Sequence, residues 1–225
     1  SVKSIGNNAF KRCTMLTQID INSEINIIEE STFQGCSSLK SIKIPSSVVS
    51  FINSAFEGCI SLTEITIPPL LESIKANCFN NCTSLIYFSI PSKIRKIEAG
   101  TLFRCLSLVS VSIPTSVTSI GEAAFYMCSS LNKIEIPNSV NKIGNCAFYG
   151  CSSLVEIIIP NNINLIKYSL FYGCSNLQKV SIPSSVTNIE KNVFRGCSSL
   201  RQLKIPSSIN VKNLELNSGV DIERI

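Results

Sequence analysis

The chain has no histidine and no tryptophan among its 225 residues, and only 16% of its residues are charged. Without histidine there is no imidazole base, no Ser-His or Cys-His nucleophile pair and no histidine ligand for zinc. We therefore expect no enzymatic activity, no cofactor and no metal site. The apolar fraction of 44% also excludes intrinsic disorder, which requires few apolar residues and a high net charge.

The excess of positive charge is small and is spread along the chain. The net charge is +5, and the longest basic runs are the pairs Lys11-Arg12 and Arg95-Lys96. Nucleic-acid binding requires basic residues that gather on one face, so we expect no nucleic-acid partner. No apolar run approaches the ~18 residues that span a membrane. The first residues, 1–5, are not followed by the apolar segment that is typical of a signal peptide. We therefore expect no membrane span.

Nine of the eleven cysteines recur at intervals of 23 residues. A leucine stands three residues after each of them and an isoleucine eight residues after each. Self-similarity with a period of 20–50 residues is typical of solenoids. The nine cysteines, called ladder cysteines below, are Cys13, Cys36, Cys59, Cys82, Cys105, Cys128, Cys151, Cys174 and Cys197.

The repeat unit has a direct physical interpretation. The pattern L-x-x-I-x-I alternates apolar and other residues, which predicts a strand with one buried face. A proline usually follows and ends the strand. Residues such as Val117 and Ile120 then fold back inward. The segment around Ala124-Phe125 is expected to form a short helical or 3₁₀ turn, which a glycine such as Gly150 ends in most repeats.

These units predict an α/β repeat solenoid, because one coil cannot bury its own apolar side chains and stacked coils can. We expect a right-handed coil with a parallel sheet on the concave side and short helical or 3₁₀ turns on the convex side. The solenoid should occupy residues 1–210 in about nine repeats and begin within a repeat. Residues 211–225 are expected to form a C-terminal cap, with short strands at 213–216 and 220–222.

The unit resembles the BspA-like leucine-rich repeat family. Leucine-rich repeats have periods of 20–29 residues, and the recurring Ile-Pro, Ala-Phe and Cys-Ser-Ser-Leu segments make the resemblance specific. It covers residues 1 to about 210. The resemblance implies a cell-surface protein that adheres to host or matrix proteins without catalysis. One departure is that serine mostly stands where other leucine-rich repeats have an asparagine or cysteine after the strand.

The ladder cysteines are expected to be buried free thiols. Cysteines in equivalent positions of adjacent coils point the same way, which does not suit disulfide geometry. There is also no C-x-x-C pair with the usual spacing of a zinc site. Cys78 and Cys146 lie outside the ladder, and a local bridge there is the less favoured alternative.

A row of tyrosines also follows the 23-residue period. Tyr126, Tyr149 and Tyr172 each follow the buried aromatic residue of their coil. We expect their rings to stack on the convex side. Two interpretations stay open, a structural ladder and an interface, since tyrosine suits both.

The outward positions of the predicted strands are mostly polar but include apolar neighbours. Exposed apolar surface with a polar rim is common at partner sites, although scattered surface hydrophobic residues without function are the alternative. We expect a protein partner on this concave face. The predicted binding residues are Ile86, Tyr87, Val109, Lys133, Val155, Glu156, Ile158 and Lys179.

The sequence supports two hypotheses about function. The first is a non-catalytic binding module of the surface-adhesin type, located at the cell surface as the family resemblance implies. The alternative is a cytoplasmic scaffold or regulatory subunit, for example of a protein phosphatase or signalling protein, since free thiols suit a reducing compartment. An uncapped solenoid end would also allow copies of the chain to associate.

Overall fold

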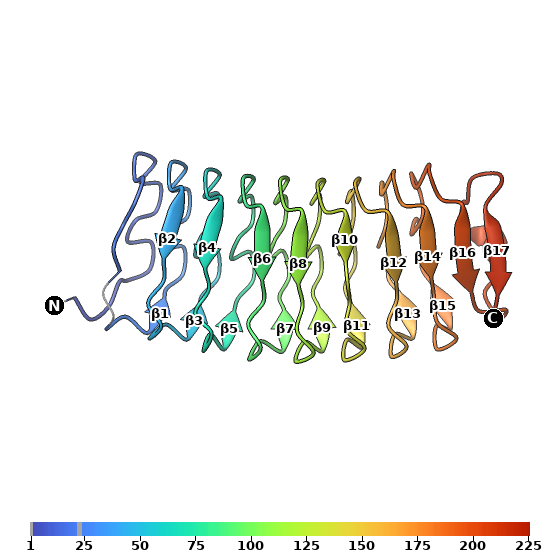
Figure 1. Ribbon diagram of the computed structural model, residues 1–225, viewed down its shortest axis with the longest axis horizontal. Coiled ribbons are helices and arrows are strands. Elements are labelled where there is room, and N and C mark those ends of the chain that lie inside the picture. Colours follow the sequence, from blue (N-terminus) through green and yellow to red (C-terminus); the bar gives the residue numbers. More distant parts are fainter. Residues whose placement is uncertain (1, 22–23) are drawn as a thin grey trace.

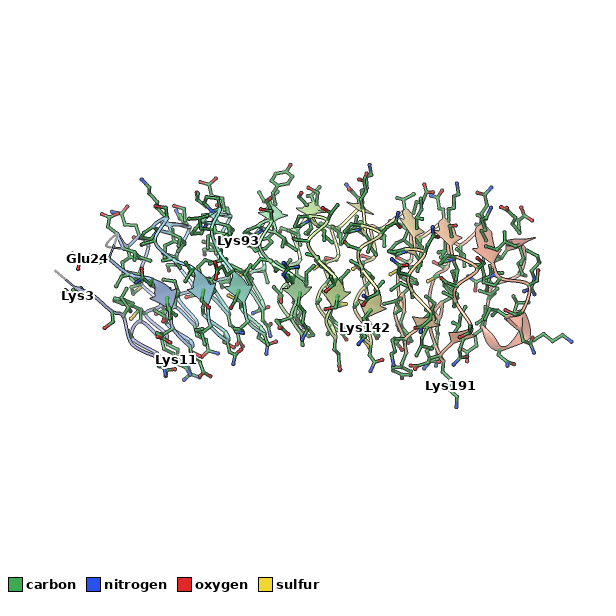
Figure 2. All side chains as sticks on the ribbon, turned by 90° about the horizontal axis from the view of Figure 1, so that it is seen from below. Lys3, Lys11, Glu24, Lys93, Lys142 and Lys191 are labelled. Atoms are coloured by element: carbon green, nitrogen blue, oxygen red, sulfur yellow. The ribbon has the colours of Figure 1, made fainter. Side chains whose placement is uncertain are left out.

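The protein forms an elongated rod of stacked coils in a computed structural model that describes residues 2–21 and 24–225. The coils follow one another in chain order, and the two termini lie at opposite ends of the rod (Figure 1). Residue 1, at which the predicted solenoid begins, lies outside the described residues. Long charged side chains such as Lys191 project from the surface (Figure 2). This architecture confirms the predicted repeat solenoid.

Each full coil contributes one strand to a main row, and every ladder pairing in this row is parallel. Equivalent residues lie opposite one another, so that Tyr87 pairs with Ser110. The row contains β2 (Ser41–Lys43), β4 (Glu64–Thr66), β6 (Tyr87–Ser89), β8 (Ser110–Ser112), β10 (Lys133–Ile134), β12 (Glu156–Ile158), β14 (Lys179–Ser181), β16 (Gln202–Ile205) and β17 (Asp221–Arg224). Its outer surface is called the strand face below.

A second row of two-residue strands runs along the rod (Figure 1). Inward-facing residues were expected along this second row, but strands were not. Each segment is short, yet it pairs in parallel with the equivalent segment of a neighbouring coil. The row contains β1 (Ile27–Ile28), β3 (Ser50–Phe51), β5 (Ser73–Ile74), β7 (Lys96–Ile97), β9 (Ser119–Ile120), β11 (Lys142–Ile143), β13 (Leu165–Ile166) and β15 (Asn188–Ile189).

The core is a continuous column of leucine, isoleucine, valine, phenylalanine and cysteine side chains. Its phenylalanine rings stack from coil to coil with centroids 5.3–6.1 Å apart. Leu102 interrupts this stack between Phe79 and Phe125, and all three side chains are fully buried. Because each ring packs against the next coil, no coil has a core of its own.

The prediction of helical or 3₁₀ turns around each core phenylalanine is wrong. In the described residues the only helix is η1 (Val211–Asn213), a 3₁₀ helix near the C-terminus. The turns around the core phenylalanines form one side of the rod, called the turn side below. Here successive N–H groups donate alternately to a carbonyl of the next coil and to a carbonyl of their own coil. Phe33 N–H donates to Ala55 O of the next coil at 2.8 Å, whereas Gln34 N–H donates to Ser31 O at 3.1 Å. A helix would use all of these donors within one coil.

Two residues in each turn have left-handed backbone conformations. One lies before and one after the core position, which is the buried phenylalanine of the coil or Leu102 in its place. Glycine was expected at the second position, and φ is 75° at Gly35. The first position was missed, because residues as different as Ser31 (φ 54°) and Ala123 (φ 50°) occupy it. These residues let the chain enter and leave the turn without continuing as a helix.

The C-terminal segment differs in part from the expected pair of strands. Residues 213–216 form no strand; η1 ends there, and Leu214 is buried against the last coil. β17 starts one residue later than expected and pairs in parallel with β16. Arg224 ties the segment down, because its Nη1 donates to Ile209 O at 2.7 Å and to Pro206 O at 3.2 Å.

We predict that Phe148→Ala lowers the free energy of unfolding by about 3–5 kcal/mol, since it leaves a cavity in the ring stack. Phe148 is fully buried, with ring centroids 5.4 Å from Phe125 and 6.0 Å from Phe171. Urea denaturation measures the loss. Tyr87→Ala, at a side chain that is 65% exposed, is the control and should stay within about 0.5 kcal/mol of the wild type. Equal losses in both variants would contradict the role of the stack.

Candidate protein-binding face

Three of the predicted binding residues meet at β6 and β8. Val109 N–H donates to Ile86 O at 2.9 Å, which places the two side chains on adjacent coils. Tyr87 stands beside them with 65% of its surface exposed. Val109 is half-buried and therefore offers less surface than the sequence suggested. The result is a small apolar neighbourhood dominated by one tyrosine.

The other five predicted residues gather farther along the strand face. Val155, Glu156 and Ile158 lie on or next to β12, between Lys133 on β10 and Lys179 on β14. Glu156 Oε1 lies 3.4 Å from the Lys179 ammonium group. The Lys133 ammonium group lies 2.8 Å from a carboxylate oxygen of Glu135, two residues farther along the same coil. These exposed pairs contribute little to stability, but they neutralise the charges beside the apolar residues.

Both rows of strands are interrupted at the same two places. In the part of the chain that the structure describes, no ladder joins β4 to β6 or β5 to β7, and none joins β10 to β12 or β11 to β13. The turn side continues across each junction, as where Cys146 N–H donates to Tyr168 O at 3.0 Å. The strand pairing therefore divides the rod into three blocks, β1–β5, β6–β11 and β12–β17. They stay joined along the turn side and, on the strand side, by Ile86 N–H to Thr63 O and Val155 N–H to Asn132 O, each at 3.4 Å.

A ladder of serine hydroxyls bridges four of the junctions at which the strands stay paired. Each hydroxyl donates to a carbonyl of the preceding coil just beyond the main strand. The bonds run from Ser47 to Ile25, from Ser116 to Ile94, from Ser139 to Val117 and from Ser185 to Ile163, with oxygen–oxygen distances of 2.6–2.7 Å. All four of these junctions keep their paired strands. These hydroxyls thus tie successive coils together just beyond the main strand.

The two interrupted junctions have other residues at the serine position. Lys93 stands there at the first, with its ammonium group on the Glu72 carboxylate at 2.8 Å. Asn162 stands there at the second, and its amide donates to Asn138 O at 2.7 Å. Leu70 also lacks the hydroxyl, but its junction stays paired. There the Ser50 and Ser73 hydroxyls bond directly at 2.9 Å.

An apolar groove of about 860 Å³ lies on the strand face along β10, beside the interruption between β10 and β12. Ile113 and Ile136 line it and are only half-buried, whereas Ile182, which occupies the same position in its coil, is fully buried. Val155 and the 63%-exposed Ile158 complete its apolar surface. The sequence analysis missed Ile113 and Ile136 because the strand pattern assigns them to the core. Asn162 in place of the ladder serine marks the junction beside Ile136, but no comparable signal marks Ile113.

Most of the predicted binding residues on this part of the strand face line the groove. Four of them line it, namely Lys133, Val155, Glu156 and Ile158. Lys179 lines an adjoining cavity of about 320 Å³, which Glu156 and Ile158 also line.

A second groove of about 550 Å³ lies at the other interrupted junction, between β5 and β7. Its lining includes Lys75, Lys93 and Arg95, so it is charged where the first groove is apolar.

All eleven cysteines are free, as expected, and eight of the nine ladder cysteines are buried. The expected burial is wrong for Cys13, which is exposed in the first described coil. Each buried ladder thiol also donates to the core-position carbonyl of the preceding coil, as in Cys128 Sγ to Leu102 O at 3.2 Å. Burial raises the pKa of these thiols, to about 11 for Cys36 and about 12 for Cys197. They are therefore neutral core groups rather than nucleophiles.

Residues 2–21 and 24–225 contain no group of three or more Cys, Asp or Glu side chains that could hold a metal ion. Among the same residues, no helix has the length and apolar character of a membrane span.

The repeat matches the family described as "BspA type Leucine rich repeat region (6 copies)" over residues 3–131 and 118–218. The chain belongs to this BspA-type family. The match confirms the resemblance noted in the sequence, and it extends over both interrupted junctions.

Solved structures of leucine-rich repeat proteins are similar to this BspA-type chain. The leucine-rich repeat protein of T. pallidum is 28% identical, with a TM-score of 0.61 over 88% of this chain and 82% of that one. A leucine-rich cell surface protein of Faecalibacterium prausnitzii is 24% identical, with a TM-score of 0.53 over 99% of this chain and 83% of that one. No curated protein matches the chain.

We predict that raising the pH destabilises the fold through the buried thiols. An unfolded thiol ionises near its ordinary pKa of about 8.5, whereas Cys128 keeps its proton in the fold up to a pKa of about 12. Above that lower pKa the unfolded chain binds fewer protons than the folded chain. The free energy of unfolding should then fall by about 1.4 kcal/mol per thiol and pH unit.

Denaturation curves between about pH 8 and 11 measure this loss, since the window lies between the unfolded and folded thiol pKa values. Cys128→Ala should show a shallower loss than the wild type. Ser198→Ala, which removes no thiol, should keep the wild-type slope. A stability that does not change across this range would contradict the assignment of the thiols to the core.

We predict that Ser139→Ala lowers the free energy of unfolding by about 1 kcal/mol, because Val117 O loses its 2.7 Å bond to the hydroxyl. Urea denaturation measures the change. Ser198→Ala is the matched control, since its hydroxyl makes an exposed 3.3 Å bond to Ser175 O. The ladder would have no special role if both variants behaved alike.

Proposed function

We propose that this BspA-type protein is a non-catalytic module that binds a protein partner on its strand face. The observation that carries the proposal is the apolar groove between β10 and β12, with Ile113, Ile136 and Ile158 in its lining. An apolar centre inside a polar rim is characteristic of protein interfaces. The groove is also large enough to take several apolar side chains of a partner.

The charges beside the groove favour an apolar partner segment. Lys133 is neutralised by Glu135, and Glu156 by Lys179. A partner segment that covers these pairs leaves no charge without its counterion, so the main gain comes from burying Val155 and Ile158. The groove is built on strands rather than long loops, which supports a preformed site.

A more specific role as a cell-surface adhesin for host or matrix proteins has two supports. One is membership of the BspA-type family. The other is the strand-face groove, which faces outward and is accessible to a large partner.

An intracellular scaffold is the alternative, and the eleven free cysteines favour it, since free thiols persist in reducing compartments. Antibody staining of intact and permeabilised source cells distinguishes the two roles. Staining of intact cells supports the adhesin, and staining only after permeabilisation supports the scaffold.

We predict that Ile158→Asp weakens binding of the whole chain to an immobilised matrix protein at least about tenfold, since it buries a charge in an apolar contact. The probes are fibronectin, laminin and collagen, each tested by biolayer interferometry. Leu70→Asp is the matched control, because Leu70 is 52% exposed but does not line the groove.

Circular dichroism must show that both variants are folded. A folded Ile158→Asp variant with wild-type affinity would refute the groove as the binding site. Absence of wild-type binding to all three probes would refute the matrix-adhesin role. Tyr87→Asp shows in the same assay whether the neighbourhood at β6 and β8 takes part.

A further inference from the structure

An aromatic ladder runs along the turn side, as the 23-residue spacing of its tyrosines predicted. The ring centroids of Tyr126 and Tyr149 are 4.5 Å apart, and those of Tyr149 and Tyr172 are 4.6 Å apart. The planes of these pairs differ by only 13° and 3°. Phe103 stacks on Tyr126 at one end, and the Arg195 guanidinium carbon lies 6.0 Å from the Tyr172 ring at the other.

The backbone holds these rings in register. Met127 N–H donates to Tyr149 O at 2.6 Å, and Gly150 N–H donates to Tyr172 O at 2.7 Å. Each bond fixes a tyrosine to the preceding coil next to its own ring. All three tyrosines are half-buried, so the ring faces cover one another while part of each side chain stays accessible to solvent.

We propose that this tyrosine ladder is a site of oxidative crosslinking, with a haem peroxidase and hydrogen peroxide as the oxidant. The peroxidase removes one electron and one proton from each of two adjacent phenols. The two radicals join through the ring carbons next to the hydroxyl groups, and the hydrogens on those carbons return to the oxygens. One hydrogen peroxide takes up the two electrons and two protons and becomes two waters.

Coupling within the ladder is favoured by proximity. Two rings already in contact react as if at very high concentration, whereas coupling between molecules requires an encounter. The chain has five tyrosines, and neither Tyr87 nor Tyr168 stacks on another ring in the described part of the chain. Tyr149 is the one tyrosine with a tyrosine on both sides, so it takes part in either product. The crosslink joins positions 23 residues apart without using a cysteine.

The test treats the dilute full chain with horseradish peroxidase and one equivalent of hydrogen peroxide. The expected product has the blue fluorescence of dityrosine, migrates as a monomer in denaturing gels, and joins Tyr149 to Tyr126 or Tyr172 in peptide mass spectra. Tyr149→Phe keeps a ring in the stack and should lower the monomeric dityrosine yield about tenfold. Tyr87→Phe is the matched control and should give the wild-type yield.

Three results would overturn the proposal. They are an unchanged yield in Tyr149→Phe, crosslinks that map to Tyr87 or Tyr168, and a product found only in dimers. Circular dichroism of the variants before oxidation confirms that the stack is compared in folded proteins.

Discussion

Hydrogen bonds between neighbouring coils on the turn side are the interaction on which the rest of the structure depends. They continue across every junction, including the two where both rows of strands are interrupted. Side chains reinforce them, since Phe33 O accepts both the Cys36 N–H and the Cys59 thiol. With 16% charged residues and no disulfide, the rod relies on these bonds and on the apolar column beside them.

The strand side is held more selectively. Ladder serines bridge four of the junctions with paired strands, and a pair of hydroxyls bridges a fifth. Where Asn162 replaces the serine, the strands lose their ladder pairing, and a groove that Ile113 and Ile136 line lies beside this junction. The departure from serine at Asn162 thus coincides with a break in strand pairing and with the groove beside it.

The 23-residue period was sufficient to predict the coil, the main strand row, the buried column and the stacked tyrosines. It could not predict the left-handed residue before each core position, because Ser31 and Ala123 share no local preference for that conformation. Hydrogen bonds to the next coil impose it instead. The second strand row was missed for a similar reason, since two-residue segments carry no alternation that can be read from sequence.

The candidate site was predicted in part. Exposed Val155 and Ile158 followed from the strand period, because their positions point outward whatever the neighbouring coils do. The partial exposure of Ile113 and Ile136 depends instead on how neighbouring coils cover them. Sequence reasoning about one coil at a time does not reach a property of a junction.

The one-sided junctions give the rod a particular mechanical response. At each, the turn side keeps its hydrogen bonds between coils, whereas the strand side has lost its ladder pairing and keeps fewer bonds. A load that bends the rod should concentrate its rotation at β4/β6 and β10/β12 and leave the three blocks rigid. Because the apolar groove lies beside the second of these junctions, bending should widen or narrow it. Tension on the molecule would then change its affinity for the partner that is proposed to bind there.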